Sequence, residues 1–233
     1  MFLIKKAEME RECPVCGFKA SHFDSWSAPE SPKEQKDIQC PQCQSHPRHR
    51  ALWLYLRRNT GFWNMTDKKF LHVAPEPCFI WKFKRAFNDY ITADLNAPNV
   101  AVKMDITDIP FPDETFDIIM CNHVLEHVKD DKKAMAEIYR AMKKGGMAIL
   151  LVPMNSFVYA TYEDMSITDP GKKISAFWQA DHFRAYGLDY FDALKNEGFK
   201  VSAMEWHEYL TREEREKFLG KNTHNDIMFH CTK

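Results

Sequence analysis

From residue 69 onward, short apolar runs alternate with segments whose apolar residues recur at helical spacing. Such alternation is typical of a parallel β-sheet with helices packed on both of its faces. The pattern predicts strands at residues 70–74, 90–94, 100–104, 116–121, 147–152, 199–204 and 226–231, and helices at 79–87, 132–142, 188–196 and 212–219. We therefore predict an α/β fold with a mostly parallel seven-stranded sheet in residues 69–233.

Two segments fall outside this pattern. Residues 153–186 are polar and aromatic without a clear period, which in a compact domain usually marks a lid or a binding loop. Because this segment follows the fifth strand, we expect it to lie over the cleft at the carboxyl ends of the strands. Residues 1–48 also lack a periodic apolar pattern, whereas helical spacing in residues 49–68 predicts a helix that links them to the main domain.

Four of the seven cysteines form two Cys-x-x-Cys pairs: Cys13 with Cys16, and Cys40 with Cys43. Each pair places two thiolates on one tight turn, and the two pairs together supply the four ligands of a tetrahedral Zn²⁺ site. Metal binding would then provide the folding energy that this segment lacks. A redox pair is one alternative, although such pairs normally occur singly and beside a βαβ pattern. Another is a histidine in place of one cysteine: His22, His46 or His49.

Composition narrows the class of protein. Apolar residues make up 45% and charged residues 28% of the chain, an ordinary globular balance, and the formal net charge of −1 gives no overall basic field. The longest apolar run, 147–153, is too short to span a bilayer, and residues 1–8 lack the apolar core of a signal peptide. We therefore expect a cytoplasmic protein without a membrane partner, whose cysteines are thiols or metal ligands rather than disulfides.

Carboxylates stand at the carboxyl ends of three predicted strands, where α/β folds bind their ligands. Glu76 lies in the turn after the first strand, Asp94 ends the second and Asp105 follows the third. The first turn reads Ala-Pro-Glu-Pro, and its prolines remove N–H donors that the pyrophosphate of a dinucleotide would require. An acidic turn instead suits the ammonium group of S-adenosylmethionine, and Asp94 suits its ribose hydroxyls. The alternative role for each acid is a helix cap or a solvated turn.

Residues 105–127 read Asp-Ile-Thr-Asp-Ile-Pro-Phe-Pro-Asp-Glu-Thr-Phe-Asp-Ile-Ile-Met-Cys-Asn-His-Val-Leu-Glu-His. This stretch resembles the third and fourth strands of class I S-adenosylmethionine-dependent methyltransferases, which often read D-x-x-x-L-P-F-x-x-x-x-F-D-x-V followed by L-E-H. The resemblance, which covers roughly residues 69–205, implies a Rossmann-like fold, although the first turn departs from the family's G-x-G-x-G. It also implies a cofactor pocket made by these residues: Ala74, Glu76, Asp94, Leu95, Asp105, Ile106, Asn122 and His123. In this family Glu126 and His127 either orient the loop after the fourth strand or touch the ligand.

Residues 45–50, 162–168 and 179–187, together with the cysteine pairs, resemble a narrower set of bacterial and viral methyltransferase-domain proteins. Because that set is associated with glycan or specialised metabolism, the likeness implies methylation of oxygen or nitrogen on a small-molecule or glycan acceptor.

The segment 153–186 offers residues for such an acceptor. His182, beside Asp181, is a candidate general base and His123 is the next, since imidazole titrates near neutral pH. Arg184 would hold an anionic group of the substrate through its planar fork. Further candidates for the substrate wall are Tyr162, Asp164, Trp178 and Tyr186. The alternative is that these residues fasten the segment to the domain through hydrogen bonds.

A second hypothesis assigns the cysteine-rich module to RNA or protein recognition, either as the guide of an RNA methyltransferase or as a binding protein with a degenerate methyltransferase domain. It is favoured by a basic cluster on the linking helix: Arg48, His49, Arg50, Arg57 and Arg58. A basic stretch on one helix is, however, more often a solvated face, and RNA binders normally carry a pronounced basic patch. We therefore rank the small-molecule or glycan acceptor first.

Overall fold

The structure is a computed structural model that describes residues 10–27, 34–220 and 227–233, so parts of the predicted 1–48 module and residue 226 lie outside the described residues. The described chain forms two compact units, which are taken one at a time. The first contains the described parts of residues 1–64 and 204–228 together with Pro77–Phe79. The second contains Met65–Glu76, Ile80–Ala203 and Phe229–Lys233. The proposed boundaries after residues 48 and 68 stay predictions.

A seven-stranded sheet with the strand order β12-β13-β9-β8-β5-β6-β7 forms the framework of the larger unit. Its strands are β5 (Lys69–Val73), β6 (Asp89–Asp94), β7 (Val102–Lys103), β8 (Phe116–Cys121), β9 (Met142–Ile149), β12 (Lys200–Glu205) and β13 (Ile227–Thr232). The five strands from β5 to β9 pair in parallel, while β13 is antiparallel to β9. The predicted mostly parallel seven-stranded α/β sheet is therefore confirmed.

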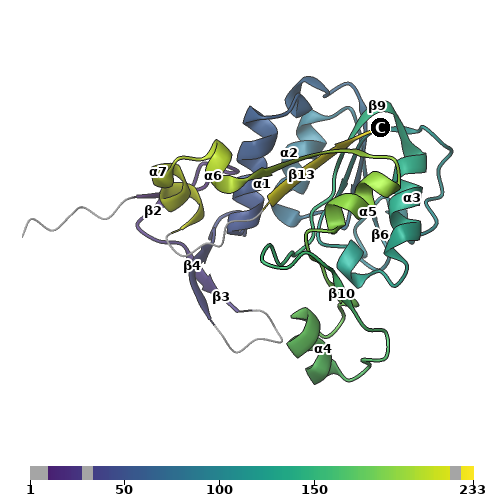
Figure 1. Cartoon of the computed structure of the whole chain (residues 1–233). Helices are drawn as coiled ribbons and strands as arrows, with labels where there is room; N and C mark the ends of the chain where they lie inside the picture. The colour runs from purple at the N-terminus through teal and green to yellow at the C-terminus, as the bar shows by residue number, and fades with distance from the viewer. Residues whose placement is uncertain (1–9, 28–33, 221–226) are drawn as a thin grey trace, which may run out of the picture. The chain divides into compact units, whose positions relative to one another are not determined.

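Helices cover both faces of this sheet: α2 (Pro77–Ala86), α3 (Asp131–Ala141) and α5 (Tyr190–Asn196). The chain steps from β5 to β6 in one direction and from β8 to β9 in the other, so right-handed crossovers place α2 and α3 on opposite faces. Figure 1 shows α3 and α5 close together. The ring centroids of Tyr139 in α3 and Phe199, which follows α5, are 5.1 Å apart. The order reverses between β5 and β8, which is where sheets of this kind open a ligand site.

Two local differences from the predicted elements have physical reasons. Strand β9 begins at Met142 rather than at residue 147, because its pairing with β8 shifts between Met142 and Met147. The Lys-Lys-Gly-Gly sequence between these residues is the irregular stretch of that pairing, with Gly145 at a φ of +74°. The segment 153–186 also contains regular structure: the paired strands β10 (Tyr162–Glu163) and β11 (Arg184–Ala185), and helix α4 (Pro170–Phe177), visible in green beyond β10 in Figure 1.

The smaller unit holds the cysteine-rich segment. Its strands are β1 (Arg11–Glu12), β2 (Lys19–Ala20), β3 (Asp24–Trp26) and β4 (Gln35–Gln39). Its helical elements are α1 (Pro47–Arg58), η1 (Phe62–Asn64), α6 (Trp206–Tyr209), α7 (Arg212–Glu214) and the π-helical turn η3 (Arg215–Leu219). Helix α1 covers part of the predicted helical segment 49–68, and its role as a link between domains stays a prediction. Across the described ranges, no helix has both the length and the apolar character needed to cross a membrane.

Candidate functional site

Glu76 is the centre of a hydrogen-bonded chain at the carboxyl ends of β5 and β8. Its Oε2 lies 2.6 Å from Nε2 of His72, and its Oε1 accepts a hydrogen bond from Nδ2 of Asn122 at 2.9 Å. Nδ1 of His72 lies 2.7 Å from the hydroxyl group of Tyr90. His72 and Asn122 are buried, so the carboxylate is held in one orientation before any ligand arrives.

The direction of these hydrogen bonds follows from the carboxylate of Glu76, which can only accept. Nε2 of His72 therefore donates to Glu76, and in that tautomer Nδ1 accepts from the hydroxyl group of Tyr90. Burial, and secondly the charge of Glu76, raise the pKa of Tyr90, so its hydroxyl group keeps the proton that it donates. A carboxylate that accepts from both neighbours keeps its negative charge, which is the charge that an ammonium ligand requires. Sequence reasoning missed His72 and Tyr90, whose signal is a polar side chain within each of two apolar strands.

Backbone strain marks the same edge of the sheet. Ala74 follows β5 with a φ of +45°, and His123 lies just beyond β8 with a φ of +54°. Residues other than glycine adopt this left-handed region at a cost of about 1–3 kcal/mol, and such residues gather at functional sites. The first turn thus takes a backbone conformation that favours glycine although it has alanine there. The turn therefore has this conformation even though its sequence departs from the glycine-rich pattern.

Asp94 and Asp105 each close a turn with one carboxylate oxygen. Oδ1 of Asp94 accepts from the backbone N–H groups of Asn96 and Ala97, both at 2.7 Å. Oδ1 of Asp105 accepts from the backbone N–H and the hydroxyl group of Thr107, and these hydrogen bonds lower the pKa of Asp105. The capping role is therefore real for both acids, and it fixes the direction in which each carboxylate points.

One neighbour of these acids offers apolar surface. Leu95 is 60% exposed directly after Asp94, and Ile106, next to Asp105, is buried. Exposed leucine beside a fixed carboxylate suits a flat nucleoside, whose ring would cover the apolar side chain while its polar groups reach the acid.

Arg184 and Tyr186 do not face a substrate in this structure, which corrects their predicted role. Arg184 is buried, and its guanidinium donates to the backbone carbonyl oxygens of residues 125, 128 and 129 at 2.6–2.9 Å and to Glu163 at 2.7 Å. The hydroxyl group of Tyr186 donates to Asp131 at 2.6 Å. Both residues therefore fasten segment 153–186 to the loop after β8, which is the alternative role considered above.

Replacing Arg184 with lysine is expected to lower the free energy of unfolding of the second unit by about 2–4 kcal/mol. Lysine keeps the charge, but its single ammonium group cannot satisfy three carbonyl oxygens and a carboxylate arranged around a planar fork. Urea unfolding followed by circular dichroism measures the change, with the exposed Arg85→Lys as the control. A loss below 0.5 kcal/mol, the scale of an ordinary surface substitution, would contradict the fastening role.

Asp181 and His182, both predicted as catalytic residues, bind different partners in this structure. Nδ1 of His182 donates to the carbonyl oxygen of Phe177 at 2.7 Å, and the side chain is buried, which lowers its pKa. Asp181 instead lies 3.0 Å from Nδ1 of His127. A buried imidazole without access to solvent does not exchange protons with an acceptor, so His182 is a poor general base here. His123 is 27% exposed and stays the better candidate.

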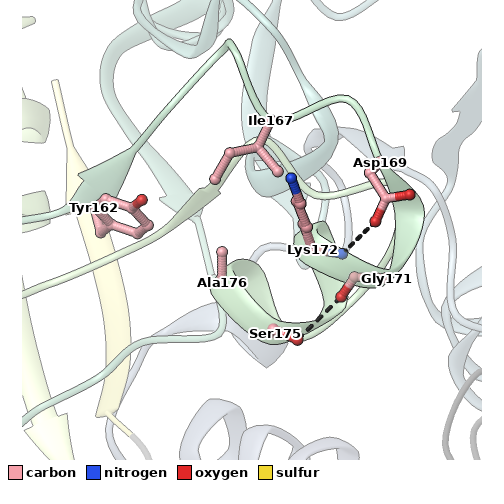
Figure 2. A pocket seen from close by; sticks show the side chains of 7 residues that line it. All are labelled: Tyr162, Ile167, Asp169, Gly171, Lys172, Ser175 and Ala176. Atoms are coloured by element: carbon pink, nitrogen blue, oxygen red, sulfur yellow. Dashed lines mark hydrogen bonds between the residues drawn. The ribbon is translucent and has the colours of Figure 1, made fainter.

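An open hollow of about 600 Å³ lies on segment 153–186, and Figure 2 shows the side chains that line it. They are Tyr162, Ile167, Asp169, Gly171, Lys172, Ser175 and Ala176. Asp169 accepts from the backbone N–H of Lys172 and so caps the first turn of α4. Tyr162 thus lines a hollow, and its place in a substrate wall stays a prediction. Asp164 instead accepts from Ser166 within its own turn, and Trp178 ends α4 with its side chain 45% exposed.

The four cysteines of the first unit converge. Their sulfur atoms all lie within 4.8 Å of one another, and the Sγ pairs Cys13–Cys43 and Cys16–Cys40 are each 3.6 Å apart. Four sulfurs around Zn²⁺ at 2.3 Å would be spaced by about 3.8 Å, close to these distances. Two matching turns present them: the N–H of Gly17 donates to the carbonyl oxygen of Cys13, and that of Gln44 to Cys40. The thiols therefore fit a zinc ion.

Arg50 does not belong to an exposed basic patch, which corrects its place in the predicted cluster. Its side chain is fully buried and donates to the backbone carbonyl oxygens of Ser45, Ile38 and Phe218. Arg58 is paired with Glu214 at 2.8 Å. The surface of α1 is thus less basic than its sequence indicates.

Comparison with known proteins agrees with this description. Residues 82–150 match the family described as "Methyltransferase domain". An uncharacterized protein of Methanocaldococcus jannaschii is 31% identical over 129 residues, which cover 51% of this chain and 60% of that protein. The C-methyltransferase UbiE of ubiquinone and menaquinone biosynthesis from Marinomonas sp. is 37% identical over 82 residues, covering 33% and 32% of the two chains. This chain therefore spans less than two thirds of either relative.

Solved structures share the fold at low identity. YcgJ from Bacillus subtilis has a TM-score of 0.52 at 17% identity, over 79% of this chain and 98% of that one. A phosphoethanolamine N-methyltransferase of Haemonchus contortus, solved with phosphomonomethylethanolamine and S-adenosylhomocysteine, has a TM-score of 0.51 at 17% identity, over 79% and 53%. These structures share the fold of this chain, and the family match places a methyltransferase domain over residues 82–150.

Proposed function

We propose that this protein transfers a methyl group from S-adenosylmethionine to a small-molecule or glycan acceptor. The observation that carries the proposal is the held carboxylate of Glu76, followed by acids at the ends of the next two strands. Strands β5, β6 and β7 are parallel neighbours, so their carboxyl ends lie side by side at about 4.8 Å per strand. Three acids along one edge match the cationic and hydroxyl groups of this nucleoside.

Each residue of the site then has a defined task. Glu76 accepts the ammonium group, and Asp94 accepts the ribose hydroxyls. Asp105 accepts the adenine amino group while Leu95 and Ile106 pack against the ring. Ala74 shapes the first turn, and Asn122 and His123 line the methionine part.

The bound cofactor supplies a methyl group on a positively charged sulfur. The chain then mainly has to align an acceptor with that group, which is worth up to ~7–11 kcal/mol of barrier in favourable cases. His123 is the proposed base for a hydroxyl acceptor, since its Nδ1 lies 3.5 Å from Glu126 and its ring is partly exposed.

The names of similar proteins widen the choice of acceptor atom. UbiE is named as a C-methyltransferase and the Haemonchus contortus enzyme as an N-methyltransferase. Carbon therefore joins oxygen and nitrogen among the acceptor atoms to be tested. The RNA alternative loses support because Arg50 is buried; salt-dependent retention on RNA would restore it. The structural Zn²⁺ at the four cysteines and the cytoplasmic location stay part of the proposal.

Replacing Asp94 with asparagine is expected to weaken S-adenosylhomocysteine binding by about tenfold, ~1.4 kcal/mol. Asparagine keeps an oxygen that can accept from the backbone N–H of Asn96, but it loses the negative charge that favours hydrogen bonds from the two ribose hydroxyls. Asp94→Ala removes both the oxygen and the charge, so it should bind S-adenosylhomocysteine more weakly still. Isothermal titration calorimetry measures the affinity. Asp89→Asn, at the opposite end of the same strand, is the matched control and should bind as the wild type does. Wild-type affinity in both Asp94 variants would remove this residue from the pocket.

A further inference from the structure

Glu126, His127 and His182 bring three metal-binding side chains to one point of the second unit. Glu126 and His127 lie in the short helical turn η2 (Leu125–His127), and His182 precedes β11 in segment 153–186. One ligand atom of each lies within 4.8 Å of the others. Glu126 and His182 are each 1% exposed, whereas the side chain of His127 is 32% exposed. Two residues of this cluster are thus buried, and the third is reached by solvent.

Two of these ligand atoms lack a partner among the described residues. Oε2 of Glu126 and Nε2 of His182 are both buried and make no hydrogen bond. A buried polar atom left without a partner costs about 1–3 kcal/mol, and more when it is charged. Two unpaired lone pairs also repel each other, and a cation bound between them would satisfy both.

Contacts at Nδ1 of both imidazoles leave Nε2 as the nitrogen available to a metal ion. Nδ1 of His182 donates to the carbonyl oxygen of Phe177, and Nδ1 of His127 lies 3.0 Å from Oδ2 of Asp181. With protons on both Nδ1 atoms, each Nε2 keeps its lone pair. Metal-bound histidines are oriented in this way, by a carbonyl or carboxylate oxygen on the opposite nitrogen. Asp181 and Phe177 therefore act as the outer shell of a site with three inner ligands.

We propose that Glu126, His127 and His182 bind a divalent transition-metal ion such as Zn²⁺. Two imidazole nitrogens and one carboxylate suit Zn²⁺ or Fe²⁺ better than Mg²⁺ or Ca²⁺, which take oxygen ligands. Binding would draw the ligand atoms to a spacing of roughly 3.3 Å, which the partly exposed His127 can provide by rotation.

The ion would join the turn after β8 to segment 153–186. These parts are already linked by the N–H of Phe183, which donates to the carbonyl oxygen of Glu126 at 2.9 Å. Three protein ligands are also the number that leaves a coordination position open, as in catalytic zinc sites. That position would bind an acceptor oxygen and lower its pKa, a role that rests on the proposed methyl transfer.

The test compares metal content after zinc loading and gel filtration. Wild type should carry one more Zn²⁺ per chain than Glu126→Gln or His127→Ala, whereas the control His207→Ala, an exposed histidine of the first unit, should match wild type. Glu126→Gln keeps the shape of the buried side chain, and circular dichroism confirms that each variant is folded. Equal zinc in wild type and both variants would overturn the site.

Cobalt separates this site from the cysteines. Co²⁺ bound by four thiolates gives sulfur-to-metal charge-transfer absorption and intense d–d bands at long wavelength, whereas Co²⁺ at Glu126 and the two histidines adds weaker d–d bands at shorter wavelength and no charge transfer. Those weaker bands should disappear in His127→Ala, and Asp181→Asn should weaken Co²⁺ binding by about 10- to 100-fold through the lost outer contact. Retained bands in His127→Ala would contradict the assignment. S-adenosylhomocysteine binding by the same samples tests the proposed function separately, because the cofactor residues are not ligands of this ion.

Discussion

Replacing Glu76 with glutamine is expected to weaken binding of S-adenosylmethionine and S-adenosylhomocysteine by roughly 25- to 150-fold, ~2–3 kcal/mol. Glutamine preserves the shape of the side chain and can still accept from Asn122. Its amide N–H can face His72 after that imidazole exchanges its tautomer, so the fold of the turn is retained. What is lost is the negative charge opposite the ammonium group, in a place where the carboxylate is only 11% exposed and poorly screened by water.

Calorimetry with both compounds measures this loss, and two further variants locate its cause. Tyr90→Phe removes the hydroxyl group that donates to His72 but leaves the charge of Glu76, so affinity should fall less than tenfold. Asp113→Asn removes an exposed carboxylate of the same unit and should leave affinity unchanged. If Glu76→Gln binds both compounds as tightly as wild type, the ammonium group is held elsewhere and the proposed pocket is wrong.

The sheet was predictable because a strand that is buried on both faces gives a continuous apolar run in the sequence. Strand β8 occupies the predicted residues 116–121, an apolar run that only Asp117 interrupts, as expected for a central parallel strand. The acids after the strands were equally visible, since a polar residue that follows an apolar run stands out. The start of β9 was missed because glycines read as the end of a helix even where they form an irregular strand pairing.

Partners of polar residues were not predictable in the same way. Arg184 and a substrate-binding arginine look alike in sequence, because an irregular segment has no period that tells which side chains face the protein. The carbonyl oxygens that Arg184 binds are more than 50 residues away in the chain. The meeting of His182 with Glu126 depends likewise on how segment 153–186 folds back onto the turn after β8. Only a three-dimensional arrangement brings such residues together.

In the first unit, the negative charge of a zinc-bound cysteine cluster would be balanced by buried arginine. Zn²⁺ with four thiolates carries a net charge of −2, which is unfavourable inside a protein unless cations lie nearby. Arg50 is fully buried and Arg11 nearly so, and both guanidiniums lie 4.9 Å from the ring centre of Phe23. The charges of Cys13, Cys40 and Cys43 raise the pKa of Arg50, although burial, the larger cause, lowers it overall to about 10. Arg50 therefore depends on the charge of the cysteine cluster, whereas Arg11 is paired with Asp37 at 2.8 Å.

Cys40→Ser is accordingly expected to abolish stoichiometric zinc at the cysteines and to destabilise the first unit by at least ~3 kcal/mol, because it removes a ligand and leaves buried arginine charge uncompensated. Differential scanning calorimetry should show this unit melting at a lower temperature, while S-adenosylhomocysteine still binds the second unit. Cys231→Ala, a buried cysteine outside the cluster, should keep wild-type zinc at the cysteines and lose only about 1 kcal/mol. The four-thiolate site would be excluded if Cys40→Ser kept its full zinc content and its cobalt derivative kept the wild-type charge-transfer band. Three sulfurs cannot produce the same spectrum as four.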